Sequence, residues 1–444
     1  MGAGGDLTER LLLPGLGRVV ESARGLELTL IGAARTAQSD EEWQALVRHS
    51  LETAGVSAST VDALAAGARF VQTDASKPDD LKALLDACPS RPVLYVALPS
   101  AMGRTVVESL AAIDPPDDLV LAIEKPFGED LDDAGALNAA LADVIPDDRL
   151  WRIDHFLGNA TVLGMLGLRF GNRLLDASWN ADQIEKVEIV YDEELGIEGR
   201  AAFYEQTGAL RDMLQSHLLM VLALVAMERP SEITASAVHD RMAEVLGATR
   251  LWRDDPHSAR RARYTEGRVG DRFFPSYVDD PDVDPEGNIE TLAQLILQVD
   301  TPRWQGVPFV LRSGKAIGSP RAEAAVHFRP SSPPSGLRGA QPGEGTVLRV
   351  SLINGDVNLD LFVNGADDAT MLDRVTLEAH PGEAKLDAYA QVLAGVVQND
   401  QLLSVRGDIA EQCWRIVTPV LNAWQAGETP LEEYTAGSNG PEDW

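Results

Sequence analysis

The chain has 444 residues, of which 45% are hydrophobic and 6% aromatic, a composition typical of a globular protein large enough for two packed domains. Its formal net charge of −31 excludes a nucleic-acid or anionic-membrane surface, because a negative field repels phosphate and no basic stretch offsets it. Two cysteines without metal-ligand spacing, no basic-then-apolar leader and no apolar run of about 18 residues predict a cytoplasmic protein with reduced thiols and no membrane span.

The chain opens with a glycine-rich segment, residues 2–16, that runs into an apolar helix. Gly2 and Gly5 predict a tight turn, and the amides at the helix start, near Asp6 and Leu7, are placed to hold a pyrophosphate. Glycines in an N-terminal tail without a ligand are the alternative. A buried strand normally delivers the chain to such a turn, and none precedes Gly2. We expect a gene start further upstream, because a lost central strand would leave unpaired backbone groups on both neighbours.

The rest of the first domain, residues 1–152, alternates strand-like and helix-like segments. Such alternation predicts a Rossmann-type α/β domain with a parallel sheet covered on both faces. The first strand ends in Arg35, where an NAD-preferring enzyme commonly carries an acidic residue, so a cation there suits the 2′-phosphate of NADP. A solvated strand-end arginine is the alternative. The predicted strands cover 26–35, 68–74, 92–99 and 119–128, and helices are expected from Ser39 and over 79–87.

Residues 153–444 have a different pattern, which predicts an α+β domain with a large, mostly antiparallel sheet. Helical periodicity occurs over 160–170 and 207–227. A segment rich in Pro, Gly and Ser, residues 329–345, is expected to form a surface loop between two strands. Alternating strand patterns occur at 183–194, 291–300, 324–330, 346–353 and 357–363.

Several sequence blocks carry more specific information than these periodicities. They are EKPFGEDL (124–131), RIDHFLG (152–158), EGR (198–200), ALRDMLQSHLL (209–219) and RWQGVPFVLRSGK (303–315). In their order and spacing they resemble the signature blocks of the glucose-6-phosphate dehydrogenase family, and the similarity runs over essentially the whole chain. A lone helical histidine such as His217 is more often a core residue, but this resemblance favours a catalytic one.

The resemblance implies the following roles. His217 matches the general base that takes the proton of the C1 hydroxyl as hydride passes to a nicotinamide. Asp154 matches the carboxylate that orients this imidazole, and Lys125 the lysine between substrate and nicotinamide. By the same resemblance Glu193 and Asp212 bind sugar hydroxyls, His155, Asn159 and Lys315 lie at the substrate end, and Leu98 and Pro99 lie against the nicotinamide. For each residue the alternative is a packing or surface role.

Departures from the family pattern concentrate where the sugar phosphate would bind. The family normally has tyrosine and lysine where this chain has Phe156 and Asn159. Losing the lysine removes a charge-assisted hydrogen bond worth about 1.5–3 kcal/mol. Arg10, Arg152 and Arg321 are candidates to compensate. A glycine at position 4 replaces a hydroxyl residue, which weakens the case for NADP over NAD.

Three functions follow from the resemblance and these departures. The leading one is oxidation of glucose 6-phosphate to 6-phosphogluconolactone with NADP, with NAD as the other acceptor. The second is dehydrogenation of a different or unphosphorylated aldose, since the departures favour reduced dependence on the phosphate. The third is a catalytically silent paralogue that binds or regulates a partner. No metal is implied, and the resemblance predicts a homodimer or homotetramer.

Overall fold

The computed structural model describes residues 1–23, 25–99, 101–339, 344–382, 384–442 and 444. They form two compact units, the first comprising residues 1–160, 231–239 and 384–411, and the second 161–230, 240–383 and 412–444. This division differs from the predicted boundary after residue 152. The helix that begins at Ala388 packs with the first unit, although it is far in sequence from residues 1–160 of that unit.

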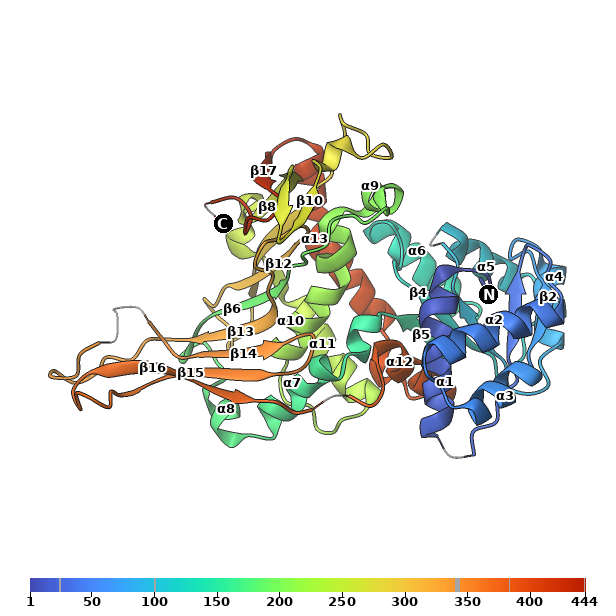
Figure 1. Cartoon of the computed structure of the whole chain (residues 1–444), viewed down its shortest axis with the longest axis horizontal. Coiled ribbons are helices and arrows are strands. Elements are labelled where there is room, and N and C mark those ends of the chain that lie inside the picture. Colours follow the sequence, from blue (N-terminus) through green and yellow to red (C-terminus); the bar gives the residue numbers. More distant parts are fainter. Residues whose placement is uncertain (24, 100, 340–343, 383, 443) are drawn as a thin grey trace. The chain divides into compact units, whose positions relative to one another are not determined.

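The first unit contains two separate parallel sheets among its described residues (Figure 1). One pairs β1 (Ile31–Ala34) with β2 (Arg69–Gln72), and the other has the order β3 (Val93–Val96), β4 (Val120–Glu124), β5 (Leu150–Ile153). The predicted single parallel sheet is therefore in two pieces. The helices are η1 (Thr8–Leu12), α1 (Leu13–Ser22), α2 (Asp40–Thr53), α3 (Ala58–Ala66), α4 (Pro78–Asp86), α5 (Ala101–Ala111), α6 (Leu131–Ala142) and α12 (Ala388–Gln398).

Local sequence explains most of these boundaries. Helix α2 begins after Ser39 because Ser39 and Glu42 form a capping box, with the Ser39 amide donating to Glu42 over 2.8 Å. Its apolar face buries Trp43, Val47 and Leu51 in one hydrophobic cluster with α3. Strand β1 is shorter than predicted and begins only at Ile31. It pairs with the four-residue β2, which limits the length of the ladder.

The second unit contains a ten-stranded sheet that is mostly antiparallel, as the sequence predicted (Figure 1). Only two of its described ladders are parallel, that of Ile184–Tyr191 with Phe309–Gly314 and that of Ala259–Thr265 with Leu431–Thr435. The strands, in sheet order, are β16 (Leu372–Ala379), β15 (Val357–Asn364), β14 (Val347–Ser351), β13 (Ala322–Phe328), β6 (Ile184–Tyr191), β12 (Phe309–Gly314), β11 (Leu292–Val299), β8 (Ala259–Thr265) and β17 (Leu431–Thr435), with β7 (Thr249–Leu251) pairing with β11. Strands β9 (Gly267–Val269) and β10 (Arg272–Phe274) form a separate hairpin.

A long helical segment, Ala201–Ala226, lies in the core of the second unit. It consists of α9 (Ala201–Ala209), the π-helical η4 (Leu210–Leu218) and α10 (Leu219–Ala226). By length and composition it could cross a membrane, but 89% of its most apolar window is buried, as in the core helix of a folded domain. The other helices that complete this part of the chain are α7 (Ala160–Phe170), α8 (Arg173–Ser178), α11 (Ala235–Gly247) and α13 (Gly407–Gln425).

Candidate active site

Three parallel strands bring candidate residues to one edge of the first unit. Strands β3, β4 and β5 run in the same direction, so their carboxyl ends lie side by side. The chain then leaves them through Leu98–Pro99, Lys125 and Asp154–His155 respectively. In the β4–β5 register Glu124 lies opposite Ile153, which makes Lys125 and Asp154 the next neighbours. The three predicted groups therefore share one edge, as ligand-binding residues of open parallel sheets do.

Glu124, the residue before Lys125, is an additional ionisable group at this edge. Its carboxylate accepts a hydrogen bond from the Tyr95 hydroxyl of β3. Burial, opposed by that hydrogen bond and reinforced by the charge of Asp154, raises the pKa of Glu124 to about 7. The edge therefore carries one carboxyl group that changes charge near neutral pH.

Asp154 is buried and begins the short helix η3 (His155–Gly158). Its carboxylate accepts the Phe156 amide over 3.0 Å, which fixes the side chain at the helix start. The next side chain, His155, stacks on Tyr389 of α12 with ring centroids 5.2 Å apart and an interplanar angle of 9°. Burial and the nearby charges of Glu124 and Asp154 raise the pKa of Tyr389, so this phenol stays neutral.

The two departures from the family pattern lie in the same helical turn. Phe156 is buried, with 4% of its surface exposed, and packs as a core residue. Asn159 ends the turn and is half-buried, and its amide donates to the Phe156 carbonyl over 3.1 Å. Because that bond is made by the backbone, the position of residue 159 does not depend on its side chain.

The glycine turn fits a dinucleotide phosphate. A Cβ atom at Gly2 would lie 2.2 Å from the Ala97 carbonyl oxygen, so only glycine allows this close approach of the two backbones. The helix that follows starts at Asp6, and the Gly5 carbonyl accepts the Thr8 amide over 3.0 Å. This helix therefore begins directly at the end of the glycine turn, which is where a pyrophosphate site would lie.

Two side chains near this turn bear on the choice of nucleotide. Arg35 is exposed directly after β1. The hydrogen bonds from Ser76 lower the pKa of Asp74 on the following loop, and the charges of Lys77 and Arg35 add to that effect. Gln38 is a residue that the sequence patterns missed. A Cβ atom at Gly4 would lie 3.8 Å from its amide nitrogen, and its buried Oε1 has no hydrogen-bond partner among the described residues.

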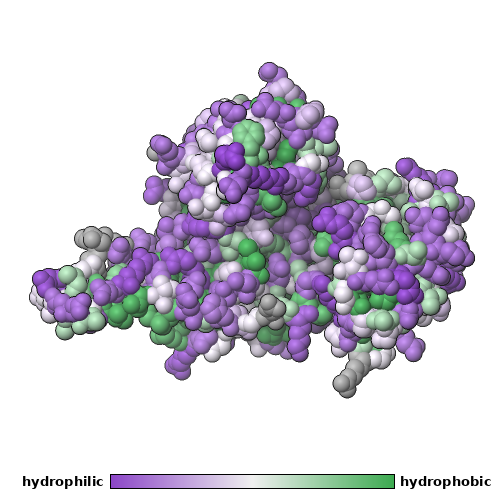
Figure 2. Space-filling model, viewed as in Figure 1, coloured by the Kyte–Doolittle hydropathy of each residue, from purple (hydrophilic) through white to green (hydrophobic). Residues whose placement is uncertain are grey.

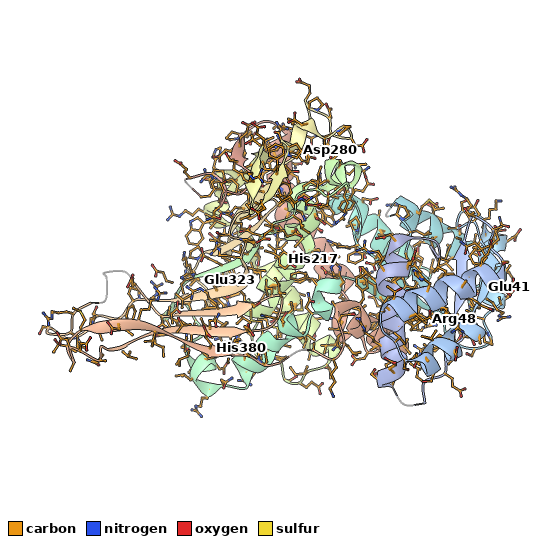
Figure 3. The ribbon with its side chains drawn as sticks, viewed as in Figure 1. Glu41, Arg48, His217, Asp280, Glu323 and His380 are labelled. Carbon is orange, nitrogen blue, oxygen red and sulfur yellow. The ribbon has the colours of Figure 1, made fainter. Side chains whose placement is uncertain are left out.

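In the second unit, His217 and Asp212 lie on the π-helical segment η4 (Figure 3 labels His217). A π-helix bonds residue i to residue i+5, so these two side chains, five residues apart, lie about one turn apart on the same face. A straight α-helix would place them on different faces. The helix is broken before this segment at Gly208, and the buried Glu290 caps the new start by accepting the Leu210 amide over 2.9 Å.

Glu193 and Lys315 form an ion pair in the second unit. Lys315 follows β12, and its Nζ lies 5.9 Å from the centre of the Tyr204 ring. Burial raises the pKa of Tyr204, and the charges of Asp212, Glu290 and Glu193 add to the effect. Lys315 thus lies near one neutral phenol, and the charges of two other predicted residues of this unit, Glu193 and Asp212, act on that phenol.

The three arginines considered as substitutes for the missing lysine have other partners. Arg10 pairs with Asp6 over 3.2 Å on the surface. Arg321 lies 3.9 Å from Glu188 and 3.8 Å from Glu323. Arg152 is buried next to the first unit's own segment 404–407, where Ser404 accepts its backbone amide over 3.1 Å, and burial lowers its pKa.

Comparison with known proteins establishes the family to which this chain belongs. Residues 1–163 match the family described as glucose-6-phosphate dehydrogenase, NAD binding domain, and residues 166–444 match its C-terminal domain. The chain belongs to the glucose-6-phosphate dehydrogenase family. Among curated relatives, glucose-6-phosphate 1-dehydrogenase of Gluconobacter oxydans is 37% identical over 99% of this chain and 93% of its own length. The Treponema pallidum enzyme of that name is 33% identical over 99% of this chain and 91% of its own length.

Solved structures agree with this family membership. A glucose-6-phosphate 1-dehydrogenase from Mycobacterium avium superposes with a TM-score of 0.87 at 32% identity, covering 100% of this chain and 94% of that one. A glucose-6-phosphate dehydrogenase in complex with glucose 6-phosphate superposes with a TM-score of 0.89 at 27% identity, covering 99% and 94%. The predicted fold, a Rossmann-type domain followed by a domain with a large sheet, is confirmed.

Sequence reasoning missed several polar residues that lie near the predicted site residues. They are Gln38, Tyr95, Glu124, Tyr204 and Tyr389. Glu124 had a signal, because it stands inside the EKP block, but only the adjacent lysine was singled out. Tyr389 had none, because it comes from a helix far along the sequence that joins the first unit.

Proposed function

We propose that the protein oxidises glucose 6-phosphate at C1 to 6-phosphogluconolactone, with NADP as the hydride acceptor. The observation that carries this proposal is the shared edge of β3, β4 and β5, where Lys125 and Asp154 are neighbours, in a chain that matches the glucose-6-phosphate dehydrogenase family along its whole length. The identity of the substrate is inferred from the names of the relatives, and the type of reaction is inferred from the residues of this chain.

His217 would act as the general base in this reaction. A neutral imidazole can take the proton of the C1 hydroxyl while hydride leaves the same carbon, and the sugar carbonyl forms without a free alkoxide. Asp154 would orient this imidazole and stabilise its charged form. The Phe156 amide would hold the Asp154 carboxylate ready for that contact.

The remaining residues would bind and orient the sugar. Lys125 would hold the C1 hydroxyl end, at the edge next to the Leu98–Pro99 segment. Glu193 and Asp212 would accept hydrogen bonds from sugar hydroxyls, and His155 and Lys315 would supply positive charge to the phosphate. The neutral Tyr204, near Lys315, would offer a hydroxyl without adding negative charge.

The nicotinamide dinucleotide, when bound, supplies the acceptor for the hydride from C1. Gly2 and Gly5 would allow its pyrophosphate to approach the helix start near Asp6 and Leu7, and Leu98 and Pro99 would flank the nicotinamide ring. We assign NADP over NAD on the exposed Arg35 after β1, whose charge suits a 2′-phosphate.

A second candidate, dehydrogenation of an unphosphorylated aldose, is favoured by Phe156 and Asn159. The core packing of Phe156 offers no hydrogen bond to a phosphate, and Asn159 offers no charge. The arginines considered as compensation are engaged with Asp6, Glu188 and Glu323 or buried. A homodimer or homotetramer remains our expectation for the assembly.

The test is a substrate and cofactor panel on the full chain and on His217→Gln. We expect reduction of NADP with glucose 6-phosphate, lowered by about 10²–10⁴-fold in kcat for the variant, because a general base contributes that much. His257→Gln, at a short surface turn, is the matched control and should keep full activity. No turnover with any sugar and either nucleotide would establish the silent-paralogue function instead.

The same panel separates the two sugar classes. If glucose 6-phosphate is preferred, Asn159→Lys should strengthen that preference by about tenfold or more in kcat/KM, since a charge-assisted hydrogen bond is worth about 1.5–3 kcal/mol. Asn159→Gln, which adds no charge, should leave it unchanged. A parent enzyme that turns over glucose as well as its 6-phosphate would favour the second candidate.

A further inference from the structure

The chain bends just after Lys315, the residue that we expect to supply positive charge to the substrate phosphate. Ala316 is buried and has a φ of 52°, a left-handed conformation that is unfavourable for a residue with a Cβ atom. Such a conformation persists only where the surrounding structure holds it in place. The Ala316 amide donates to the Leu195 carbonyl over 2.9 Å, and the Lys315 amide donates to the Thr291 carbonyl over 2.9 Å. These bonds fix the amide side of the bend, residues 315–319, which we call the Lys315 turn.

The carbonyl side of the Lys315 turn binds a segment that is distant in the sequence, residues 434–439. Tyr434, on strand β17, donates its hydroxyl proton to the Lys315 carbonyl over 2.6 Å. The Gly437 amide donates to the Ala316 carbonyl over 2.8 Å. The peptide groups before and after Ala316 are thus both bonded to this segment, which explains how the unfavourable conformation is maintained.

The two segments also approach each other closely. The Gly318 amide donates to the Ser438 carbonyl over 2.9 Å, and the Ser319 amide donates to the Asn439 side-chain oxygen over 3.1 Å. A Cβ atom at Gly318 would lie 1.9 Å from the Gly437 carbonyl oxygen, so only glycine allows this approach of the two backbones. The Lys315 turn is therefore built against this segment along its whole length.

The Tyr434 hydroxyl belongs to a chain of hydrogen bonds that can run in only one direction. Because this hydroxyl uses its proton for the Lys315 carbonyl, it must accept the proton of the Thr291 hydroxyl, 3.0 Å away. The Thr291 oxygen in turn accepts the Tyr264 amide over 3.0 Å. Burial raises the pKa of Tyr434, so the phenol keeps the proton that the chain requires. The chain begins at the backbone of β8 and ends at the backbone of the lysine.

The ring of Tyr434 is held independently of its hydroxyl. Strands β17 and β8 lie side by side, with Tyr434 opposite Tyr264 (Figure 1). The two rings meet edge to face with centroids 6.4 Å apart, and the Tyr264 ring meets the Tyr277 ring in the same way at 5.9 Å. Replacing Tyr434 with phenylalanine should therefore keep the strand pairing and the ring packing, and remove only the bond to Lys315.

Two side chains assigned to the substrate depend on the Lys315 turn. The lysine forms an ion pair with Glu193, and its Nζ lies 5.9 Å from the centre of the Tyr204 ring. The Glu193 carbonyl accepts the Ile317 amide over 3.0 Å, so the backbone of the carboxylate is bonded to the same turn. A movement of the turn would therefore shift the cation and the carboxylate together.

We propose that Tyr434 is a positioning residue for Lys315. Its hydroxyl fixes the peptide group of the lysine, and this keeps the ammonium group where the sugar phosphate binds. Lys315 has that role only under the proposed function, so the proposal rests on that function. No local sequence pattern indicates the tyrosine, because 119 positions separate it from the lysine.

The test measures glucose 6-phosphate binding and turnover in the full chain, in Tyr434→Phe, in Lys315→Met and in the double variant. The Kd is measured by calorimetry without nucleotide, so it does not depend on catalysis. We expect Tyr434→Phe to raise Kd and KM by about tenfold, because a displaced cation loses part of a charge-assisted hydrogen bond. The kcat should change little, because the phosphate is bound equally in the ground and transition states. In the Lys315→Met background Tyr434→Phe should change neither Kd nor KM, since no cation remains to be positioned.

Tyr277→Phe is the matched control for the loss of a buried hydroxyl. Tyr277 is also buried and belongs to the same group of rings, but its hydroxyl donates to Glu205. This variant should lower the Tm without changing Kd or KM. Thr291→Val removes the donor to the Tyr434 hydroxyl and should act in the same direction as Tyr434→Phe, so it replaces that variant if Tyr434→Phe does not fold.

Two outcomes would overturn the proposal and leave the proposed function intact. The first is unchanged binding in Tyr434→Phe while Lys315→Met weakens it. The second is an additive effect in the double variant, because the tyrosine would then act by a route other than the lysine. A parent that binds glucose 6-phosphate but oxidises no sugar would end the proposed function alone, since Kd still tests the role of Tyr434. A parent that does not bind glucose 6-phosphate would overturn both.

Discussion

At the scale of single residues, the carboxyl edge of β3, β4 and β5 brings two carboxyl groups together, those of Asp154 and Glu124. Asp154 has a defined partner in the Phe156 amide, whereas Glu124 has a pKa near neutrality. Both groups stand next to the lysine of the EKP block. The charge of this edge therefore depends on pH near neutrality.

The raised pKa of Glu124 predicts a pH-dependent stability. The folded state holds the Glu124 proton up to about pH 7, whereas the unfolded chain releases it near 4.5, so the stability that this proton provides is lost as pH rises from 4.5 to 7. Glu124→Gln keeps a neutral acceptor for Tyr95. It should therefore be more stable than the parent above pH 7, by about 1–3 kcal/mol at most, with little difference at pH 4.5.

Urea denaturation midpoints measured from pH 4.5 to 8 test this expectation. Tyr95→Phe is the informative companion, because the tyrosine hydroxyl lowers the pKa of Glu124, and its loss should move the transition to higher pH. A parent and Glu124→Gln with parallel pH profiles would show that this carboxyl does not titrate in the predicted range.

At the scale of elements, the long helix of the second unit is organised by its break at Gly208. This residue has φ 57° and ψ −178°, and a Cβ atom there would lie 2.4 Å from Glu290 Oε1. The break lets Glu290 cap the π-helical segment that places Asp212 and His217 on one face. The glycine, the cap and the position of the candidate base are thus linked.

Gly208→Ala should therefore destabilise the protein by about 1–3 kcal/mol, because the new side chain is strained and displaces the cap. It should also lower kcat more than the stability loss explains. Gly135→Ala, in the interior of α6 with nothing within 4 Å of the added atom, is the control and should stabilise by about 0.5–1 kcal/mol. Equal effects of the two substitutions on urea denaturation would contradict the role given to the break.

Sequence reasoning located most elements but missed features that depend on distant residues. The capping box of α2 and the alternation of β6 and β11 are local signals, and the predicted elements are present. The helix predicted over 207–227 begins earlier, at Ala201, because the helical segment continues through the Gly208 break, where Glu290 caps Leu210 from 80 residues away. The stacking of Tyr389 on His155 likewise joins segments that no local pattern connects.

At the scale of the whole molecule, the outer strands of the large sheet present an apolar face. Leu359 pairs with Leu377, and Leu361 with Val375, so these four side chains share one face of β15 and β16. Leu377 is 57% exposed and Val363, on the same face, is 42% exposed. Figure 2 shows apolar residues gathered along these strands. An exposed apolar strip on an outer strand marks an interaction surface.

We expect this face to be buried between the subunits of the predicted homo-oligomer. Leu377→Glu should shift the mass measured by light scattering toward the monomer, because a charge would enter the apolar contact. Glu378→Gln lies on the opposite face of β16 and should leave the mass unchanged. A parent protein that is monomeric at micromolar concentration would remove this expectation altogether.

The first unit is assembled from pieces that are far apart in the sequence. Residues 384–411 return to it after most of the second unit has been made, and they supply Tyr389 to His155 and Ser404 to Arg152. During synthesis the amino-terminal part of the nucleotide domain must therefore wait for nearly the whole chain before its last helix arrives. Any attempt to graft or exchange this domain between relatives has to transfer both pieces together, since a single cut after residue 160 would separate it from its own core.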